Sequence, residues 1–413
     1  MYKPKLFGRQ RLIRLSMDMQ GHFHRNPPSL TREGLDADAP SHLSAAIVIS
    51  ISKRKEPPMR IEEIDKNLKV EKALGLDDVV FIDVRRDPFR VYGLYDYKNQ
   101  PVFRRMPEDI AKATNDGVYG LHIHTAGGRV RFSTDSPYIA IRCKMQGVTH
   151  FPHMPLIGTS GFDLYEHKLG TDTYIRSFMP PWDMKDGYES VQHVSDGKTM
   201  HDYTIHFPLY NDVISLEIGL REGSALTDGP DYRDIKPIVY YGSSITQGGC
   251  ASRPGNAYQN IISARRNIDH INLGFSGSAK GEDVIVEYMA GLDMSVFVCD
   301  YDHNAPTPEH LEATHEKLYR TIRAKNPDLP IIFVTKPDNL FTEDAGRRRD
   351  VVYRTYRKAF EENPRRAAYI DGYALFGVDY RDCCTVDTCH PNDAGFVRMA
   401  EVIGAEIDRM LKM

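Results

Sequence analysis

The sequence of 413 residues has no hydrophobic run long enough to cross a membrane as a helix. Its apolar run from Leu43 to Ser52 covers about ten residues, whereas a membrane-spanning helix needs about 20. The run also follows an acidic stretch and lies too far from the first residue for an ordinary signal peptide. We therefore expect a cytoplasmic protein that has no membrane partner.

Cysteine is scarce, and its spacing follows no metal-binding or redox pattern. None of the six cysteines forms a C-x-x-C pair. The group Cys383, Cys384, Cys389 and His390 matches no common zinc spacing. Unpaired thiols in a reducing compartment are the expected state, and the sequence indicates no metal or other cofactor.

Charge of one sign is also lacking. The chain has 53 Lys and Arg against 57 Asp and Glu, which gives a formal net charge of −4. This balance does not favour a nucleic-acid partner or an anionic membrane surface. With 41% hydrophobic and 27% charged residues the chain is typical of a globular protein, and its length favours two domains. The sequence does not indicate an oligomeric state.

The first 58 residues have the most unusual composition. They combine a basic beginning, the pairs Pro27-Pro28 and Pro57-Pro58, and acidic residues around Asp36. This composition predicts a disordered segment or an extension that is foreign to the natural protein, with Met59 as an alternative start.

Residues 59–232 are expected to form a β-sandwich. From Val79 to Gly223 the sequence is rich in alternating apolar and polar residues, as in Ile139, Ile141, Cys143 and Met145. A period of two is typical of half-buried strands. Residues 204–207 and 214–220 are interpreted as a hairpin, and several short strands between turns indicate a sandwich.

Residues 233–413 change to alternating strands and helices, which predicts a parallel three-layer α/β sheet. The expected strands are 238–241, 271–275, 296–300, 331–334 and 368–370. The expected helices are 257–265, 283–289, 308–324, 345–362 and 394–411.

A serine follows the first of these strands. Ile238–Tyr241 is a short apolar run that ends at Gly242, so Ser244 would lie at the carboxyl end of a parallel strand, where such sheets bind ligands. A serine becomes a nucleophile when an imidazole accepts its proton and a third group orients the imidazole. Asp387 and His390, three residues apart, can supply these two groups. Taken singly, Ser244 is more typical of a turn and Asp387 of a helix cap.

The motif is not the nucleophile elbow G-x-S-x-G, because its fifth residue is Thr246. The order of motifs instead resembles the SGNH hydrolases, also called the GDSL esterase/lipase family. Gly242-Ser243-Ser244-Ile245-Thr246 resembles the first block, with Ser243 in place of the usual aspartate. Asn272–Gly277 resembles the second block. Asp302–Ala305 keeps only the asparagine of the third, and Asp387–Gly395 matches the last block, D-x-x-H-P-N.

The resemblance implies acyl transfer through a serine nucleophile in a flavodoxin-like α/β/α domain. Ser244 would be the nucleophile, His390 the base and Asp387 its orienting acid. The oxyanion would be held by the backbone N–H groups of Ser244 and Gly277 and by the amide of Asn304. The chemistry needs no metal or cofactor.

The sequence leaves the substrate open. Association with the family favours a small-molecule or oligosaccharide ester, and first of all a carbohydrate O-deacetylase. Phe178, Trp182 and Tyr188 are candidates to stack on a sugar ring, or else they pack between the domains. The alternatives are a lipid esterase or thioesterase of the same family, and a carbohydrate-binding protein without catalytic activity.

Overall fold

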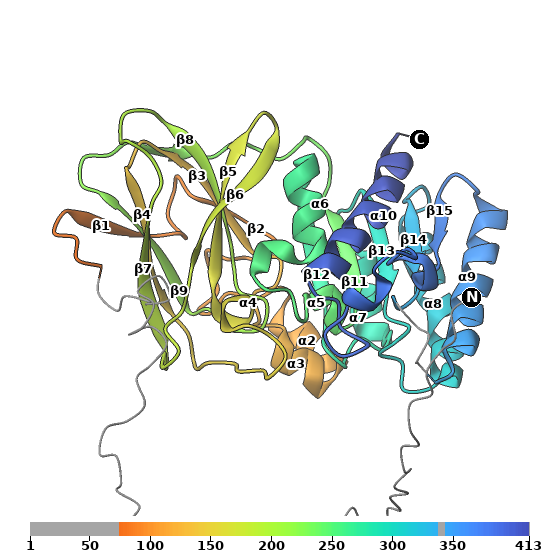
Figure 1. The fold of residues 1–413 in the computed structure, drawn as a ribbon. Coiled ribbons are helices and arrows are strands. Elements are labelled where there is room, and N and C mark those ends of the chain that lie inside the picture. The colour runs from red at the N-terminus through yellow and green to blue at the C-terminus, as the bar shows by residue number, and fades with distance from the viewer. Residues whose placement is uncertain (1–73, 338–342, 413) are drawn as a thin grey trace, which may run out of the picture. The chain divides into compact units, whose positions relative to one another are not determined.

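The computed structural model describes residues 74–337 and 343–412. The expected extension 1–58 and the candidate start Met59 lie outside these residues. Within the described part of the chain, a region of antiparallel strands is followed by a region in which strands and helices alternate (Figure 1).

Strands β1 to β10 form two antiparallel sheets. One has the order β1-β9-β4-β7, and the other has the order β10-β3-β8-β5-β6, with β2 paired to β3. The bounds are β1 Val79–Asp83, β2 Arg90–Tyr92, β3 Arg129–Thr134, β4 Tyr138–Lys144, β5 Phe162–Lys168, β6 Thr171–Phe178, β7 Gly187–His193, β8 His201–His206, β9 Ser215–Arg221 and β10 Leu226–Asp228.

The two sheets share one hydrophobic core, as the expected β-sandwich requires. Ile139, Ile141 and Cys143 project from β4 into this core, and they meet Phe132 of β3 and Ile205 of β8 from the other sheet. The alternation in the sequence therefore marks the inward face of β4 correctly.

The predicted hairpin between residues 204–207 and 214–220 is wrong. β8 pairs with β3 and β5, whereas β9 pairs with β1 and β4. The two strands therefore belong to opposite sheets, and residues 207–214 cross between them. Alternation predicts which residues face the core, but it carries no information about the sheet in which a strand pairs.

Short helices interrupt the β-rich region, and the sequence pattern did not indicate them. They are α2 Glu108–Thr114, α3 Asp116–Leu121 and α4 Leu156–Ser160. Each spans two turns or fewer, so none shows the long apolar repeat by which a helix is recognised.

The rest of the chain has a five-stranded parallel sheet of order β12-β11-β13-β14-β15. Its strands are β11 Ile238–Gly242, β12 His270–Gly274, β13 Val296–Asp300, β14 Ile331–Val334 and β15 Ala367–Ile370. Its helices are α5 Ser244–Gln247, α6 Tyr258–Arg266, α7 Asp283–Ala290, α8 Pro308–Lys325, α9 Ala345–Glu362 and α10 Asp393–Leu411. The predicted α/β order is confirmed, and this strand order is flavodoxin-like.

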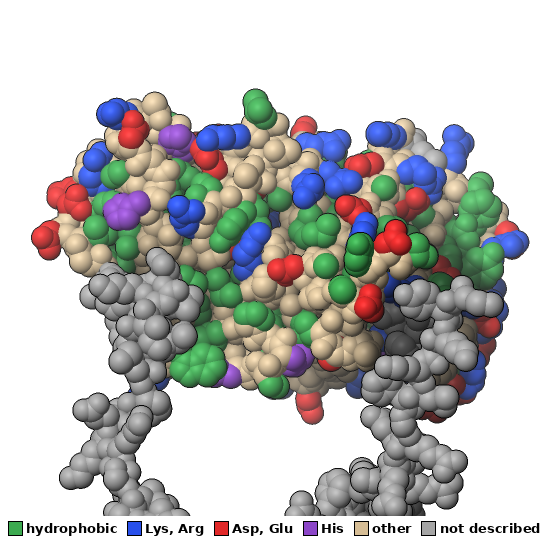
Figure 2. Space-filling view, in the orientation of Figure 1, with side chains coloured by type: hydrophobic (Ala, Val, Ile, Leu, Met, Phe, Trp, Pro, Cys, Tyr) green, Lys and Arg blue, Asp and Glu red, His purple; other side chains and the backbone are tan. Residues whose placement is uncertain are grey.

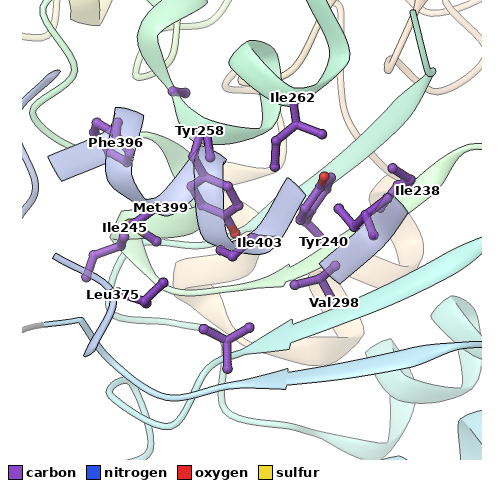
Figure 3. Close-up of a cluster of buried hydrophobic side chains, with 14 of the residues drawn as sticks. Ile238, Tyr240, Ile245, Tyr258, Ile262, Val298, Leu375, Phe396, Met399 and Ile403 are labelled. Atoms are coloured by element: carbon purple, nitrogen blue, oxygen red, sulfur yellow. The ribbon is translucent and has the colours of Figure 1, made fainter. Parts of the chain in front are cut away.

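Helices cover both faces of this sheet. Ile238 and Tyr240 of β11 pack with Val298 of β13 against residues of α6 and α10, as Figure 3 shows. Val239 and Tyr241, which alternate with them, point to the opposite face and join α7, α8 and α9. The strand order reverses between β11 and β13, and ligands bind beside such a point in doubly wound sheets.

The surface visible in Figure 2 carries charges of both signs. Acidic and basic side chains are interspersed over the face in Figure 2. Among the helices that the structure describes, none combines the length and the apolar character of a membrane span.

Candidate active site

The turn after β11 places Ser244 at the carboxyl end of the strand, as predicted. Gly242 is required there for space, because a Cβ would lie 2.1 Å from Thr246 Oγ1 and 2.3 Å from the Asp300 carbonyl. Ser243 caps helix α5 by accepting a hydrogen bond from the Ile245 N–H. The Thr246 hydroxyl donates to the buried Asp300 Oδ2 at 3.1 Å, which ties the turn to the end of β13.

Asp387 and His390 lie on the loop that precedes α10. The His390 Nδ1–H donates to Asp387 Oδ2 at 2.8 Å, and Asp387 Oδ1 accepts the backbone N–H groups of Cys389 and His390. Burial alone would raise the pKa of Asp387, but the hydrogen bonds from the His390 backbone and ring outweigh it, and the pKa lies below its usual value. Asp387 is therefore a carboxylate at neutral pH.

Ser244 and His390, 146 residues apart in sequence, meet directly. The Ser244 Oγ lies 2.8 Å from His390 Nε2. Because a carboxylate can only accept, Asp387 fixes the proton on Nδ1 and leaves Nε2 free to accept from the serine. The Ser244 residue is only 6% exposed, and the His390 side chain is 22% exposed. The three predicted residues thus form a continuous hydrogen-bonded chain that can move a proton from Ser244.

The residues expected to hold an oxyanion lie beyond the ends of the two strands that flank β11. Gly277 follows β12 with a φ of 65°, and a Cβ there would meet no atom within 4 Å. Asn304 follows β13, and one hydrogen of its amide is donated to the Phe275 carbonyl at 2.8 Å; no described residue accepts the second. In the described part of the chain no acceptor is found for the N–H groups of Ser244 and Gly277.

Buried side chains outside the predicted set hold the end of β12 and the loop after it in place. The Arg105 guanidinium donates to the carbonyls of Asn272 and Gly274 at the end of β12 and stacks over the Phe275 ring. Burial lowers the pKa of Arg105 to about 9, which still leaves it charged at neutral pH. Gln247 Oε1 accepts the Ser276 N–H at 3.0 Å. An isolated arginine in a β-rich region gave no signal of this role.

A second set missed from sequence joins the sandwich to the loop after the serine. Asp163 of β5 is fully buried, and it accepts from Arg253 Nη1 at 2.8 Å, from the Gly255 N–H at 2.8 Å and from His206 Nδ1 at 3.0 Å. Ser252 on the same loop donates its N–H and its hydroxyl to Asp393 at the start of α10. The sequence signal by which this set could have been found is the string Gly161-Phe162-Asp163-Leu164-Tyr165.

The structure separates the three aromatic candidates for a sugar platform. Phe178 is fully buried and Tyr188 is 8% exposed, both in the sandwich core, and the Tyr188 hydroxyl donates to the Phe178 carbonyl. These two side chains cannot reach a sugar, so their predicted role is corrected. They also pack inside the sandwich and not between the domains. Trp182 is 78% exposed and lies 5.2 Å from the His150 ring, centroid to centroid.

A cavity of about 460 Å³ lies beside the His390 loop. It is lined by His153, Pro155, Cys250, Ser252, Val386, Asn392, Asp393 and Ala394. The loop of the sandwich that carries His153 brings this ring within 5.7 Å of the His390 ring, centroid to centroid. Another histidine, His303, contacts Cys389 at 3.3 Å, and burial lowers its pKa to about 4.

Comparison with known families now decides the assignment. Residues 235–408 match the model of the GDSL-like lipase/acylhydrolase family, and residues 79–226 match the N-terminus of SGNH hydrolase-type esterases, called GxDLY. The chain carries a GDSL-like lipase/acylhydrolase domain. It is a carboxylic ester hydrolase. Gly161–Tyr165 spells the letters by which the N-terminal model of such GDSL esterases is named. No curated protein matches the sequence.

Solved structures agree on the fold of this GDSL hydrolase. A putative GDSL-like lipase from Bacteroides ovatus is 27% identical with a TM-score of 0.72, covering 81% of this chain and 98% of that one. The salicylyl-acyltransferase of a tetracycline biosynthetic pathway is 18% identical, with a TM-score of 0.66 and the same coverage. An acetyl xylan esterase from Butyrivibrio proteoclasticus is 12% identical, with a TM-score of 0.51, covering 81% of this chain and 99% of that one.

Proposed function

We propose that this chain hydrolyses small acyl esters, first of all acetyl esters of carbohydrates, with Ser244 as nucleophile, His390 as base and Asp387 as orienting acid. The observation that carries the proposal is the hydrogen-bonded chain Asp387–His390–Ser244, with both links at 2.8 Å. This is the geometry by which a neutral imidazole activates a serine hydroxyl.

The reaction has two steps. Ser244 Oγ attacks the ester carbonyl while His390 Nε2 accepts its proton, and Asp387 stabilises the resulting imidazolium. The tetrahedral intermediate collapses when His390 returns the proton to the departing alcohol oxygen, which leaves the acyl group on Ser244. Water, deprotonated by the same imidazole, then releases the acid and restores the serine.

Three hydrogen-bond donors can stabilise the negative oxygen of this intermediate. Within the described ranges the N–H groups of Ser244 and Gly277 have no other acceptor, and Asn304 has a second amide hydrogen to offer. The bond from Asn304 to the Phe275 carbonyl fixes the orientation of its amide before substrate arrives, so little reorganisation is needed.

Replacing Asn304 by alanine should lower kcat by about 10²–10³ and change KM little, because this donor acts mainly on the developing charge. The lost bond to Phe275 should cost only about 1 kcal/mol of unfolding free energy. Initial rates with p-nitrophenyl acetate and thermal unfolding separate the two effects. If kcat falls only in proportion to the fraction of protein that has unfolded, Asn304 has no role as an oxyanion donor.

The site favours a small acyl group. The cavity beside His390 mixes the polar side chains of Ser252, Asn392 and Asp393 with only short apolar ones, such as Pro155 and Ala394. The acetyl xylan esterase among the fold neighbours is named for an acetylated polysaccharide, which supports a carbohydrate as the alcohol part. Trp182, exposed on the sandwich, remains a candidate to stack on a sugar ring.

A series of p-nitrophenyl esters tests the acyl preference. We expect kcat/KM to be highest for acetate and to fall steadily with chain length, because the cavity offers no long apolar surface to a chain. A maximum at about eight carbons or more would favour a lipid esterase or thioesterase instead. Acetate release from acetylated xylo-oligosaccharides, measured against acetylated glycerol, then tests whether the alcohol is a sugar.

A further inference from the structure

Three side chains that could ligate a metal converge at the site, and only one of them takes part in the proposed hydrolysis. His153, Cys250 and His390 each place a ligand atom within 4.8 Å of the others. They come from the sandwich, from the loop after α5 and from the loop before α10. Among the described residues no other group of this kind was found.

His390 is already oriented as metal-bound histidines are. Its Nδ1–H donates to Asp387 at 2.8 Å, so the nitrogen left for a metal is Nε2. A histidine that binds zinc through one nitrogen nearly always donates the other to a carboxylate or carbonyl, which fixes the ring and raises its basicity. The group that prepares His390 to accept a proton also prepares it to bind a cation.

Cys250 lies on the side of the imidazole that carries Nε2. The loop passes so close that a Cβ on Gly249 would lie 3.3 Å from His390 Cδ2, the carbon next to Nε2. Cys250 has a φ of 75°, a strained conformation for a residue with a side chain. Burial raises the pKa of its thiol to about 12, so at neutral pH it is no competing nucleophile.

The set of ligands selects the metal. Two imidazole nitrogens and one sulfur, with a fourth position open, suit Zn²⁺ and not the oxygen-preferring Mg²⁺ or Ca²⁺. Tetrahedral bonding to zinc would bring the ligand atoms to roughly 3.3–3.6 Å from one another. Because these atoms now lie within 4.8 Å of one another, they must approach by roughly 1 Å, which the exposed His153 side chain can supply. The cavity lined by His153 and Cys250 gives the metal access.

We infer that His153, Cys250 and His390 form a reversible inhibitory site for Zn²⁺. Binding releases the Cys250 proton to solvent and forms a thiolate–zinc bond together with two imidazole–zinc bonds; no electron is transferred. The metal occupies His390 Nε2 and replaces the hydrogen bond from Ser244. The binding itself is independent of the proposed function, whereas the inhibition rests on it.

Cobalt titration of the full chain tests the binding directly. Co²⁺ substitutes for Zn²⁺ and produces a near-ultraviolet band when it binds a thiolate. We expect this band at one Co²⁺ per chain and its displacement by Zn²⁺. It should disappear in Cys250→Ser and weaken at least about 10-fold in affinity in His153→Ala, since losing one ligand costs on the order of a factor of ten or more. Cys389→Ser, which removes the other thiol near His390, is the matched control and should keep the band.

Activity measured in the same titration tests the consequence. With Zn²⁺ at saturation the wild-type rate should fall at least about 100-fold, the scale of losing a general base, and EDTA should restore it. Each variant is compared with its own rate without metal. A thiolate band that persists in Cys250→Ser, or is absent from the wild type, overturns the site. A normal band without inhibition keeps the site and contradicts the role proposed for His390.

Discussion

The Ser244→Ala variant should lose about 10⁴-fold or more in kcat toward p-nitrophenyl acetate, with its fold intact. The side chain removed is the only one that we propose forms a covalent bond to substrate, and loss of a serine nucleophile costs up to about 10⁶-fold in comparable hydrolases. Initial rates on purified protein, with circular dichroism to verify folding, measure the effect.

Ser243 provides the matched control, one residue away. It is also buried, but its Oγ accepts from the Ile245 N–H, whereas the serine that hydrogen-bonds to His390 is Ser244. Ser243→Ala removes a helix cap, so we expect a loss of about 0.5–2 kcal/mol of unfolding free energy and retention of most activity. Equal losses of activity in both variants would contradict the assignment of Ser244.

The Asp163→Ala variant should lose about 3–5 kcal/mol of unfolding free energy, the largest effect on stability that we expect from a single substitution. Asp163 has no exposed surface and neutralises Arg253 while it also accepts from His206 and Gly255. Removing it leaves a positive charge and two donors without their partner in a buried interface. Urea unfolding, followed by circular dichroism and by activity, measures the change.

The exposed pair Lys317–Asp283 is the control for this result. Its N–O distance of 2.6 Å is no longer than the 2.8 Å between Arg253 and Asp163, but its side chains are 61% and 67% exposed. Lys317→Ala should therefore cost about 1 kcal/mol or less. If Asp163→Ala cost no more than this, the sandwich would not be anchored through Asp163.

The acid dependence of the Asp163 contribution has a defined sign. Burial raises the pKa of Asp163, but the hydrogen bonds and charges of His206 and Arg253 outweigh it and place the pKa below its unfolded value. The contribution is therefore complete above the unfolded pKa and is lost as the pH falls through the folded one. The unfolding free energies of the wild type and of Asp163→Ala should therefore converge as the pH falls through that range.

The α/β half was predictable because its signals are local. Strand β13 is a continuous apolar run, and α9 begins and ends at the predicted residues Ala345 and Glu362. The residues of the candidate triad lie in two short motifs, one directly after β11 and the other in the loop between β15 and α10. The candidate oxyanion residues Gly277 and Asn304 came from the resemblance of their motifs to the family's second and third blocks.

The features that the sequence did not predict depend on contacts between residues that are far apart in the chain. The sheet to which β8 and β9 each belong is decided by tertiary packing and not by alternation. His153 approaches His390 only because the sandwich docks beside the α/β sheet, and Arg105 reaches β12 for the same reason. Phe178, Trp182 and Tyr188 are close together in the sequence, but strands β6 and β7 turn Phe178 and Tyr188 inward and only Trp182 of the three is exposed.

Labelling with a fluorophosphonate, followed by mass analysis of the digested peptides, tests the central claim most directly. The reagent forms a stable bond only with a serine that a neighbouring base has activated. We predict one adduct per chain on Ser244, formed in parallel with the loss of esterase activity, and no adduct in Ser244→Ala. An active enzyme that remains unlabelled at Ser244, or that keeps its activity when Ser244 is replaced by alanine, would contradict the account.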